Sequence, residues 1–206
     1  MSNPWEKIKL ADYEGHMNLE SVNQLPVLRE ILKEQLGAQH IQNAMILGIA
    51  GGAGLECVKQ GQLNKLYGID INEGFLVECK SRFGHLEPML ELINMDLMKE
   101  DCFLPKTDLL ICNLVAEYIG YDALLRSVLK SEAKVASIVI QINKQHNFVS
   151  DSPYLKSFER LDEIHCLMEE NILDERFEKI EFTKKSKKTW DLPNGKQLIR
   201  LEFVQR

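Results

Sequence analysis

The sequence predicts an α/β protein whose mostly parallel, doubly wound sheet is covered by helices on both faces. Two observations predict this class. Short runs rich in Ile, Leu and Val recur without strict in–out alternation, as in strands that are buried on both faces. Segments with helical spacing separate these runs, and such alternation is typical of right-handed βαβ units. The strand-like runs are 44–49, 65–71, 90–96, 108–114 and 135–142.

Two helices are expected between these strands, one after the second strand and one after the fourth. In each segment the apolar side chains form a stripe on one helical face. The residues of the two stripes are Phe75, Leu76, Cys79 and Phe83, and Leu124, Leu125, Val128 and Leu129.

A further helix is expected before the first strand, over 21–36. Its apolar face consists of Leu25, Leu28, Leu32 and Leu36, and Gly37 is its stop signal. Pro26 fits a helix only in the first turn, which places the start near Asn23. Residues 5–17 have no clear period and are expected to form an aromatic and polar arm.

The C-terminal part is expected to add a helix and an antiparallel hairpin. The helix is predicted over 158–170 by the spacing of Leu161, Ile164, His165 and Met168. Strand-like runs follow at 177–185 and 197–204, and residues 191–195 between them contain Asn-Gly, which favours a tight turn.

Length and composition indicate one globular domain over 1–206, with an N-terminal arm or cap at 1–40 and the core at 41–206. The chain has 206 residues, of which 45% are hydrophobic and 27% charged, and this balance excludes a disordered chain. Its formal charge of −6 disfavours nucleic acid as a partner, because a phosphate backbone attracts basic surfaces.

Membrane and metal partners are not expected either. No apolar run reaches the ~18–20 residues of a membrane span, and the N-terminus lacks the apolar stretch of a signal peptide. The five cysteines are an odd number without a C-x-x-C pair, so we expect reduced thiols, no metal site and a cytoplasmic location. A monomer and a homodimer are both compatible with the sequence.

A glycine-rich turn, 48–54, follows the first predicted strand. Glycines let the backbone approach a ligand closely, and ligands of parallel sheets bind at the carboxyl ends of the strands. The alternative is a tight turn without a ligand. The dinucleotide pattern G-x-G-x-x-G fails here, because a match started at Gly52 meets Cys57 and one started at Gly51 meets Ala53.

An acidic residue, Asp70, ends the second predicted strand. A carboxylate in this place can accept both hydroxyl protons of a ribose. Alternatively, Asp70 or Asn72 caps the following helix, and the two roles are compatible.

Four motifs in order, 46–56, 68–70, 94–97 and 108–114, resemble those of class I S-adenosylmethionine-dependent methyltransferases. The resemblance spans roughly 44–143, and the C-terminal hairpin matches the last two strands of that family. It implies a Rossmann-like sheet of seven strands in the order 3-2-1-4-5-7-6. It also implies S-adenosyl-L-methionine as cofactor and S-adenosyl-L-homocysteine as product.

The resemblance implies a role for each matching residue. The glycine-rich turn would lie beside the methionine part of the cofactor, and Asp70 would hold the ribose. Asp96 would accept from the adenine amino group, while Asn113 and Leu114 would lie near the sulfonium. The full cofactor-binding set is Gly48, Ala50, Gly51, Gly52, Gly54, Asp70, Ile71, Asp96, Leu97, Asn113 and Leu114.

The chain departs from the family pattern at two positions. Gly48 stands where many members have an acid that serves the cofactor's ammonium group, and Ala50 replaces the first glycine. Backbone carbonyls or Glu117 could substitute for the missing acid. Two roles have structural alternatives, since Asp96 could be a solvated loop carboxylate and Asn113 could cap a helix over 114–130.

Methyl transfer depends on aligning the acceptor and excluding water, and it needs a base only where the acceptor must lose a proton. The candidates for catalysis are Glu117, Tyr118 and His16. The candidates for binding the acceptor are Tyr13, His16, Asn143 and Tyr154, with His146 as a further possibility. For a lone histidine, the alternative is a surface or satisfied core residue.

The sequence therefore predicts a methyltransferase that acts on a small-molecule acceptor. Residues 113–116 differ from the N-P-P-Y tetrad of enzymes that methylate bases or amides, and the basic run 184–188 is interpreted as a solvated edge at a hairpin tip. The alternatives are a non-catalytic relative that binds the cofactor and a methyltransferase acting on RNA or protein. An NAD-dependent oxidoreductase is disfavoured by the broken glycine pattern.

Overall fold

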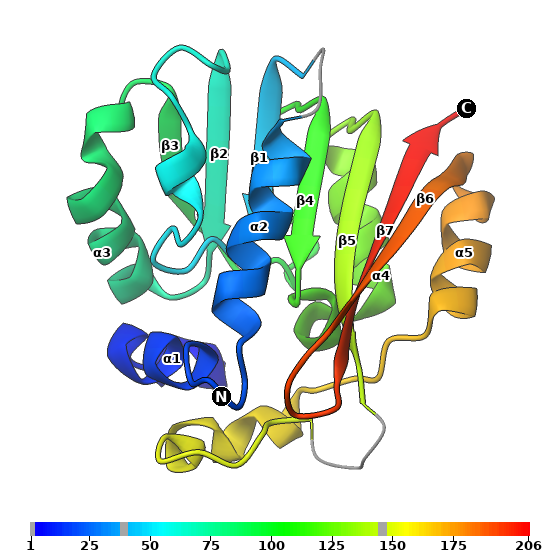
Figure 1. Cartoon of the computed structure of the whole chain (residues 1–206). Helices are drawn as coiled ribbons and strands as arrows, with labels where there is room; N and C mark the ends of the chain where they lie inside the picture. Colours follow the sequence, from blue (N-terminus) through cyan, green and yellow to red (C-terminus); the bar gives the residue numbers. More distant parts are fainter. Residues whose placement is uncertain (1–2, 38–40, 144–147) are drawn as a thin grey trace.

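The structure, a computed structural model, describes residues 3–37, 41–143 and 148–206. Its centre is a seven-stranded sheet in the order β3-β2-β1-β4-β5-β7-β6 (Figure 1), as predicted. Strands β1 to β5 pair in parallel, whereas β7 is antiparallel to both β5 and β6. The strands are β1 Asn43–Leu47, β2 Lys65–Asp70, β3 Leu90–Asn94, β4 Leu109–Asn113, β5 Val135–Ile142, β6 Phe182–Asp191 and β7 Gln197–Gln205.

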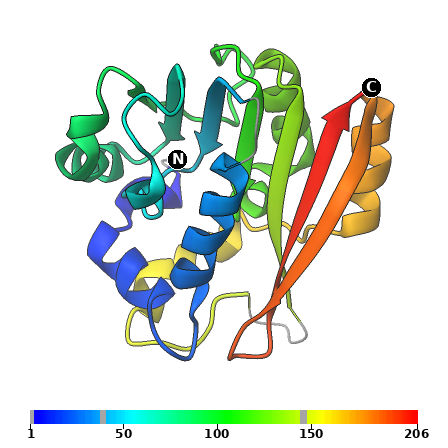
Figure 2. The ribbon, with the colours of Figure 1, turned by 45° about the horizontal axis from the view of Figure 1, so that its top comes forward.

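Helices lie on both faces of this sheet. Figure 2 shows α2 on one side of the sheet and α5 on the other. The hydrophobic clusters agree, because α2 and α3 share one core with the sheet while α4 and α5 share another. The helical elements are η1 Pro4–Lys7, α1 Leu10–Met17, α2 Gln24–Leu36, η2 Leu55–Cys57, α3 Glu73–Phe83, η3 Gly84–Leu86, α4 Ala116–Lys130, η4 Leu155–Glu163 and α5 Glu170–Lys179.

The central strands are apolar throughout because both of their faces are covered. In β1, Ala44 and Ile46 belong to the core beneath α2 and α3, whereas Met45 and Leu47 belong to the core beneath α4 and α5. This division follows from the two-residue period of a strand. The five predicted parallel strands are confirmed, with ends that differ by at most two residues.

The sequence signals at the helix ends are also confirmed. Helix α2 begins directly after Asn23, so Pro26 lies in its first turn, and Gly37 follows its last residue. At the start of α3, the side chain of Asn72 accepts a hydrogen bond from the backbone of Phe75 at 3.2 Å. Asn72 therefore caps α3 as the alternative interpretation proposed.

The predicted helix over 158–170 is wrong. Residues 155–163 form the 3-10 segment η4 instead, and α5 starts only at Glu170. The apolar residues that suggested one helix face two different cores, since Leu161 packs in the cluster of the N-terminal arm and Met168 packs beneath α4 and α5. Helix α5 was missed because Leu173 and Phe177 are its only fully buried residues.

The first hairpin strand was placed too early along the chain. It was predicted over 177–185, but Phe177 belongs to α5 and β6 spans Phe182–Asp191. The basic run 184–188 consequently lies within the exposed edge strand, not at the hairpin tip. Charged side chains on an edge strand disfavour pairing with another chain, so the protective interpretation is compatible with the new position. The predicted turn at 191–195 does join β6 to β7.

Within the described residues, no helix has both the length and the hydropathy that a membrane span requires.

The core beneath α5 gives a first testable prediction. Phe177 is fully buried and stacks on Phe203 with 4.0 Å between the ring centroids. We expect Phe177→Ala to lower the free energy of unfolding by about 3–5 kcal/mol, because it leaves a cavity. Urea denaturation measures the change. Phe103 is 82% exposed, so Phe103→Ala is the control, with an expected change within about 0.5 kcal/mol. Equal losses would contradict the described core.

Candidate functional site

A large pocket lies at the carboxyl ends of the parallel strands, the lower edge of the sheet in Figure 1. It encloses about 1150 Å³, counting the part that is open to solvent. The ends of β1, β2 and β4 form its inner side, and the segments η1, α1 and η4 contribute residues from the chain that covers this edge. This is the place where open α/β sheets bind ligands.

The turn after β1 has an unusual backbone. Gly48, Ala50, Gly52 and Gly54 all have positive φ, at 68°, 48°, 79° and 100°. Ala50 is therefore a non-glycine residue in the left-handed region, which costs free energy that glycine would not. The turn is attached to β2, since the backbone N–H groups of Gly48 and Ile49 both donate to the carbonyl of Ile69.

Close packing alone already explains why several positions of this turn are glycine. A Cβ on Gly52 would lie 2.8 Å from Sγ of Cys79, and one on Gly48 would lie 2.3 Å from a methyl of Val115. Gly48 and Ala50 line the large pocket, while Gly51 and Gly52 line a smaller adjoining one. Gly54 packs against α2, where a Cβ would meet Leu32 at 2.9 Å.

Asp70 lies between the turn and the pocket. Its Oδ2 accepts a hydrogen bond from the backbone of Ala50 at 2.8 Å, and its Oδ1 accepts one from the backbone of Asn72 at 2.9 Å. Burial raises the pKa of this carboxyl, and the backbone hydrogen bonds oppose the rise. Each oxygen retains a second lone pair. Asp70 and Ile71 both line the large pocket.

Asp96 and Leu97 follow β3 and line the same pocket. Leu97 is buried, whereas Asp96 is partly exposed and its Oδ1 accepts a hydrogen bond from the backbone of Met98 at 3.0 Å. The predicted adenine contacts therefore line the same pocket as the predicted ribose contact, Asp70. The hydrogen bond from Met98 also shows that the Asp96 side chain stabilises its own turn.

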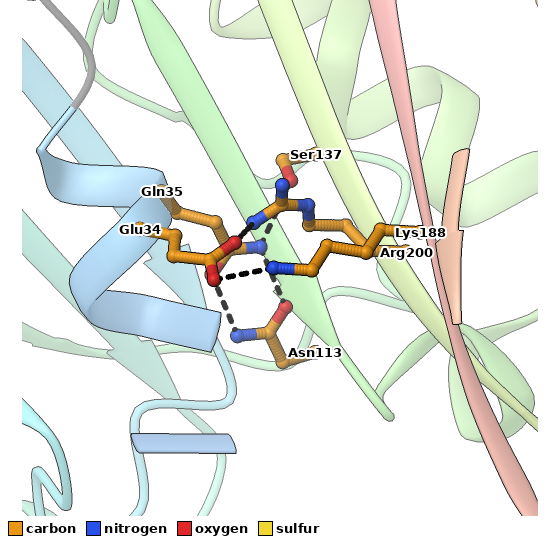
Figure 3. Close-up of polar contacts among 6 residues, drawn as sticks. All are labelled: Glu34, Gln35, Asn113, Ser137, Lys188 and Arg200. Atoms are coloured by element: carbon orange, nitrogen blue, oxygen red, sulfur yellow. Dashed lines mark hydrogen bonds and ion pairs between the residues drawn. The ribbon is translucent and has the colours of Figure 1, made fainter. Parts of the chain in front are cut away.

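Asn113 also lines the pocket, but its amide is bonded to α2 (Figure 3). Its Nδ2 donates to Oε1 of Gln35 and its Oδ1 accepts from Nε2 of Gln35, both at 3.0 Å; Gln35 also donates to Ser137 on β5. The alternative role of Asn113 as a helix cap is wrong, because α4 begins at Ala116 after Val115.

Next to this amide pair, α2 is joined to the C-terminal hairpin (Figure 3). Glu34 pairs with Lys188 at 2.6 Å and with Arg200 at 3.0 Å. The hydrogen bond from Lys188 holds the pKa of Glu34 below its usual range. Both cations also lie over the ring of Trp190. Helix α2 packs over β1, and these contacts attach it to strands β6 and β7 of the C-terminal hairpin.

Glu117 is a buried acid in the first turn of α4, and it lines the pocket. Its Oε1 accepts a hydrogen bond from the backbone of Gln141 at 2.8 Å. Burial raises the pKa of Glu117 to about 7, although this hydrogen bond opposes the rise. Tyr118 follows it along the pocket wall, and burial raises the pKa of its phenol.

Two predicted residues of the N-terminal arm reach the pocket from α1. Tyr13 packs between Trp5 and Phe75, with centroid distances of 6.0 and 5.8 Å. His16 is buried, and its Nδ1 lies 2.8 Å from the hydroxyl of Ser152. Burial lowers the pKa of His16, so its ring is neutral near pH 7. The arm therefore brings Tyr13 and His16 to the same cavity as Asp70.

The other acceptor-binding candidates lie elsewhere. Asn143 is outside the lining of the large pocket, and its Oδ1 accepts from Nε2 of Gln141 at 2.7 Å. Tyr154 packs on α1, where a Cβ on Gly15 would lie 2.5 Å from its ring. His146 lies outside the described residues.

Several pocket residues were not predicted from the sequence. Among them are five aromatic side chains that lie far apart in the sequence or in different elements: Trp5, Phe75, Phe148, Phe158 and His165. No local pattern distinguishes them from core residues. Only their shared position at one edge of the sheet, which the topology determines, could have identified them.

Comparison with known proteins adds to this geometry. No family model matches the sequence, and no curated protein matches it. Among solved structures, the N-methyltransferase NodS from Bradyrhizobium japonicum WM9, in complex with S-adenosyl-L-homocysteine, superposes with a TM-score of 0.69. The identity is 14%, and the match covers 95% of this chain and 94% of NodS. The chain has the class I methyltransferase fold.

Two further solved structures share this fold and differ in the reaction that their names give. Magnesium protoporphyrin IX methyltransferase (ChlM) from Synechocystis PCC 6803 with bound S-adenosyl-L-homocysteine has a TM-score of 0.63 at 12% identity, covering 94% of this chain and 87% of ChlM. The [4+2]-cyclase SpnF has a TM-score of 0.65 at 9% identity, covering 87% and 80%. One fold thus serves different reactions, and the reaction has to be argued from the site.

The left-handed conformation of Ala50 predicts a stabilising substitution. We expect Ala50→Gly to raise the free energy of unfolding by about 0.5–1 kcal/mol, because glycine adopts positive φ without the steric cost of a Cβ. Chemical denaturation measures the change. The control is Glu30→Gly at an exposed position in the middle of α2, which should lower the same quantity by about 0.5–1 kcal/mol. A loss of stability at both positions would refute the backbone conformation of the turn.

The burial of Glu117 predicts a pH-dependent stability. Its pKa is about 7 in the folded chain and ~4.3 in an unfolded one. The folded state therefore binds the proton more tightly, so stability falls as the pH rises from about 4.3 to about 7. Glu117→Gln removes this loss, and the difference in unfolding free energy between wild type and variant should change by about 3 kcal/mol over that range.

Urea denaturation at a series of pH values measures this difference. The control is Glu175→Gln, because Glu175 is an exposed carboxylate on α5. We expect this exposed substitution to change the free energy of unfolding by no more than about 0.5 kcal/mol. Parallel curves for wild type and Glu117→Gln would show that Glu117 titrates normally.

Proposed function

We propose that this protein is an S-adenosyl-L-methionine-dependent methyltransferase that acts on a small molecule. The observation that carries the proposal is the position of Asp70. Its carboxylate lies at the end of β2, lines the pocket and is held beside the positive-φ turn after β1 by its bond from Ala50. The binding of S-adenosyl-L-homocysteine by NodS and ChlM, which share the fold, supports the same assignment.

The residues at the strand ends fit this cofactor. Asp70 has lone pairs available for the two ribose hydroxyls, and Ile71 offers an apolar surface to the adenine. Asp96 and Leu97 would contact the adenine edge, while Leu114 would lie near the sulfonium. When bound, the cofactor supplies an electrophilic methyl group on sulfur.

A small acceptor is favoured by the way the pocket is covered. Residues of η1, α1 and η4 line it together with the strand ends. The Asn72 amide holds this cover, since its Nδ2 donates to the carbonyls of Trp5 and Ile8 at 2.8 and 2.9 Å. A covered pocket excludes water from the reacting groups. The formal charge of −6 gives no support to a nucleic-acid acceptor.

Substitution of Asp70 tests the proposal. We expect the wild-type protein to bind S-adenosyl-L-homocysteine, and we expect Asp70→Ala to raise the Kd about 10- to 100-fold, because a pair of buried hydrogen bonds is lost. Isothermal titration calorimetry measures both constants. Asp122→Ala is the control, because Asp122 has a side chain that is 82% exposed and lies on α4. Failure of the wild type to bind either S-adenosyl-L-homocysteine or S-adenosyl-L-methionine would refute the proposal.

A further inference from the structure

One carboxylate oxygen in the pocket lacks a hydrogen-bond partner. Glu117 is only 4% exposed, and while its Oε1 accepts from the backbone of Gln141, its Oε2 has no partner among the described residues. A buried acceptor without a donor costs about 1–3 kcal/mol. Because Glu117 lines the pocket, a ligand with an N–H or O–H group could provide the missing donor.

An aromatic wall lines the same pocket as this oxygen. Tyr118 directly follows Glu117, and Trp5 meets its ring edge-on with 4.9 Å between centroids. On another side, His165 lies 5.8 Å from Tyr118 and stacks on Phe148 at 3.9 Å. These residues all line the pocket. Aromatic faces stabilise nearby cations, so this wall favours a ligand that carries or develops positive charge.

The charged residues around the pocket also favour a positively charged ligand. The charged residues in its lining are the acids Asp70, Asp96 and Glu117, and neither lysine nor arginine occurs among the lining residues that the structure describes. His165 is neutral near pH 7 because burial lowers its pKa. Lys196 lies outside this lining and its Nζ donates to the carbonyl of Phe148, although its charge also lowers the pKa of His165. A carboxylate or phosphate acceptor would therefore meet repulsion, whereas an amine would meet attraction.

We propose that the methyl acceptor is a primary or secondary amine, bound between this aromatic wall and Oε2 of Glu117. The proposal rests on the proposed function above. The amine binds as its ammonium ion and gives one proton to Oε2 of the ionised Glu117, which passes it to water. The nitrogen, now uncharged, forms a bond to the methyl carbon while the carbon–sulfur bond breaks, and the electron pair of that bond stays on sulfur. The methylated nitrogen carries the positive charge and leaves as an ammonium ion. Burial suits Glu117 to this task, because its pKa of about 7 matches a proton acceptor at neutral pH.

Ligand binding tests this proposal without depending on turnover. The probes are 2-phenylethylamine, 2-phenylethanol and 3-phenylpropanoate, which share one aromatic scaffold and differ in the polar group. With the protein saturated by S-adenosyl-L-homocysteine, we expect the amine to bind about tenfold more tightly than the alcohol, and the acid to bind most weakly. Calorimetry or the shift in Tm gives the order. Glu117→Gln should abolish the preference for the amine, and the exposed control Glu175→Gln should retain it.

The outcomes separate this proposal from the general one. Wild-type protein that binds S-adenosyl-L-homocysteine but binds the alcohol as tightly as the amine would overturn the amine proposal alone. An unchanged preference in Glu117→Gln would also overturn it. In a turnover panel of amines, phenols, thiols and carboxylates, a methylated amine detected by mass supports the proposal, and methylation solely of another class refutes it. Absence of S-adenosyl-L-homocysteine binding would instead refute the methyltransferase function.

Discussion

Two polar side chains at the end of β2, Asp70 and Asn72, connect three of the segments that build the pocket. The Asp70 carboxylate accepts from the backbone of Ala50 and from that of Asn72. The amide of Asn72 in turn donates to the carbonyls of Trp5 and Ile8 and caps α3. The turn after β1, the start of α3 and the N-terminal cover are therefore held at one point. Because both residues are buried, these hydrogen bonds are little weakened by water.

The parallel part of the fold could be predicted because its cause is local in the sequence. Strands covered on both faces need consecutive apolar residues, and runs such as 109–112 show this directly. The segment between β5 and β6 could not be predicted in the same way. Its apolar residues alternate between two cores, so their spacing imitated a helix that is not there. The true helix, α5, buries too few residues to produce a clear stripe.

The candidate site, like the fold, could be predicted only where its residues form short continuous motifs. Asp70 and the turn at 48–54 belong to two short continuous motifs. Gly48, Ala50 and Asp70 line the large pocket, and Gly51 and Gly52 line the smaller adjoining one. The aromatic wall was not predictable, because Trp5, Phe148 and His165 come together only through the topology. Asn113 shows the limit of carrying a role across by position. Its place beside the pocket was expected, but its amide also pairs with Gln35, a partner 78 positions away in the chain.

The helices α1 and α2 make polar contacts with residues that lie much later in the chain. His16 lies against Ser152, and Glu34 pairs with Arg200, across 136 and 166 positions of sequence. During translation, α1 and α2 are therefore made long before the residues that hold them. The parallel strands β1 to β5 can pair as they emerge, but α2 finds its full set of partners only after β7 is synthesised. Attachment of α2 to the hairpin is then one of the last steps of folding, and a chain that stalls before β7 lacks Arg200, one of the two cations that pair with Glu34.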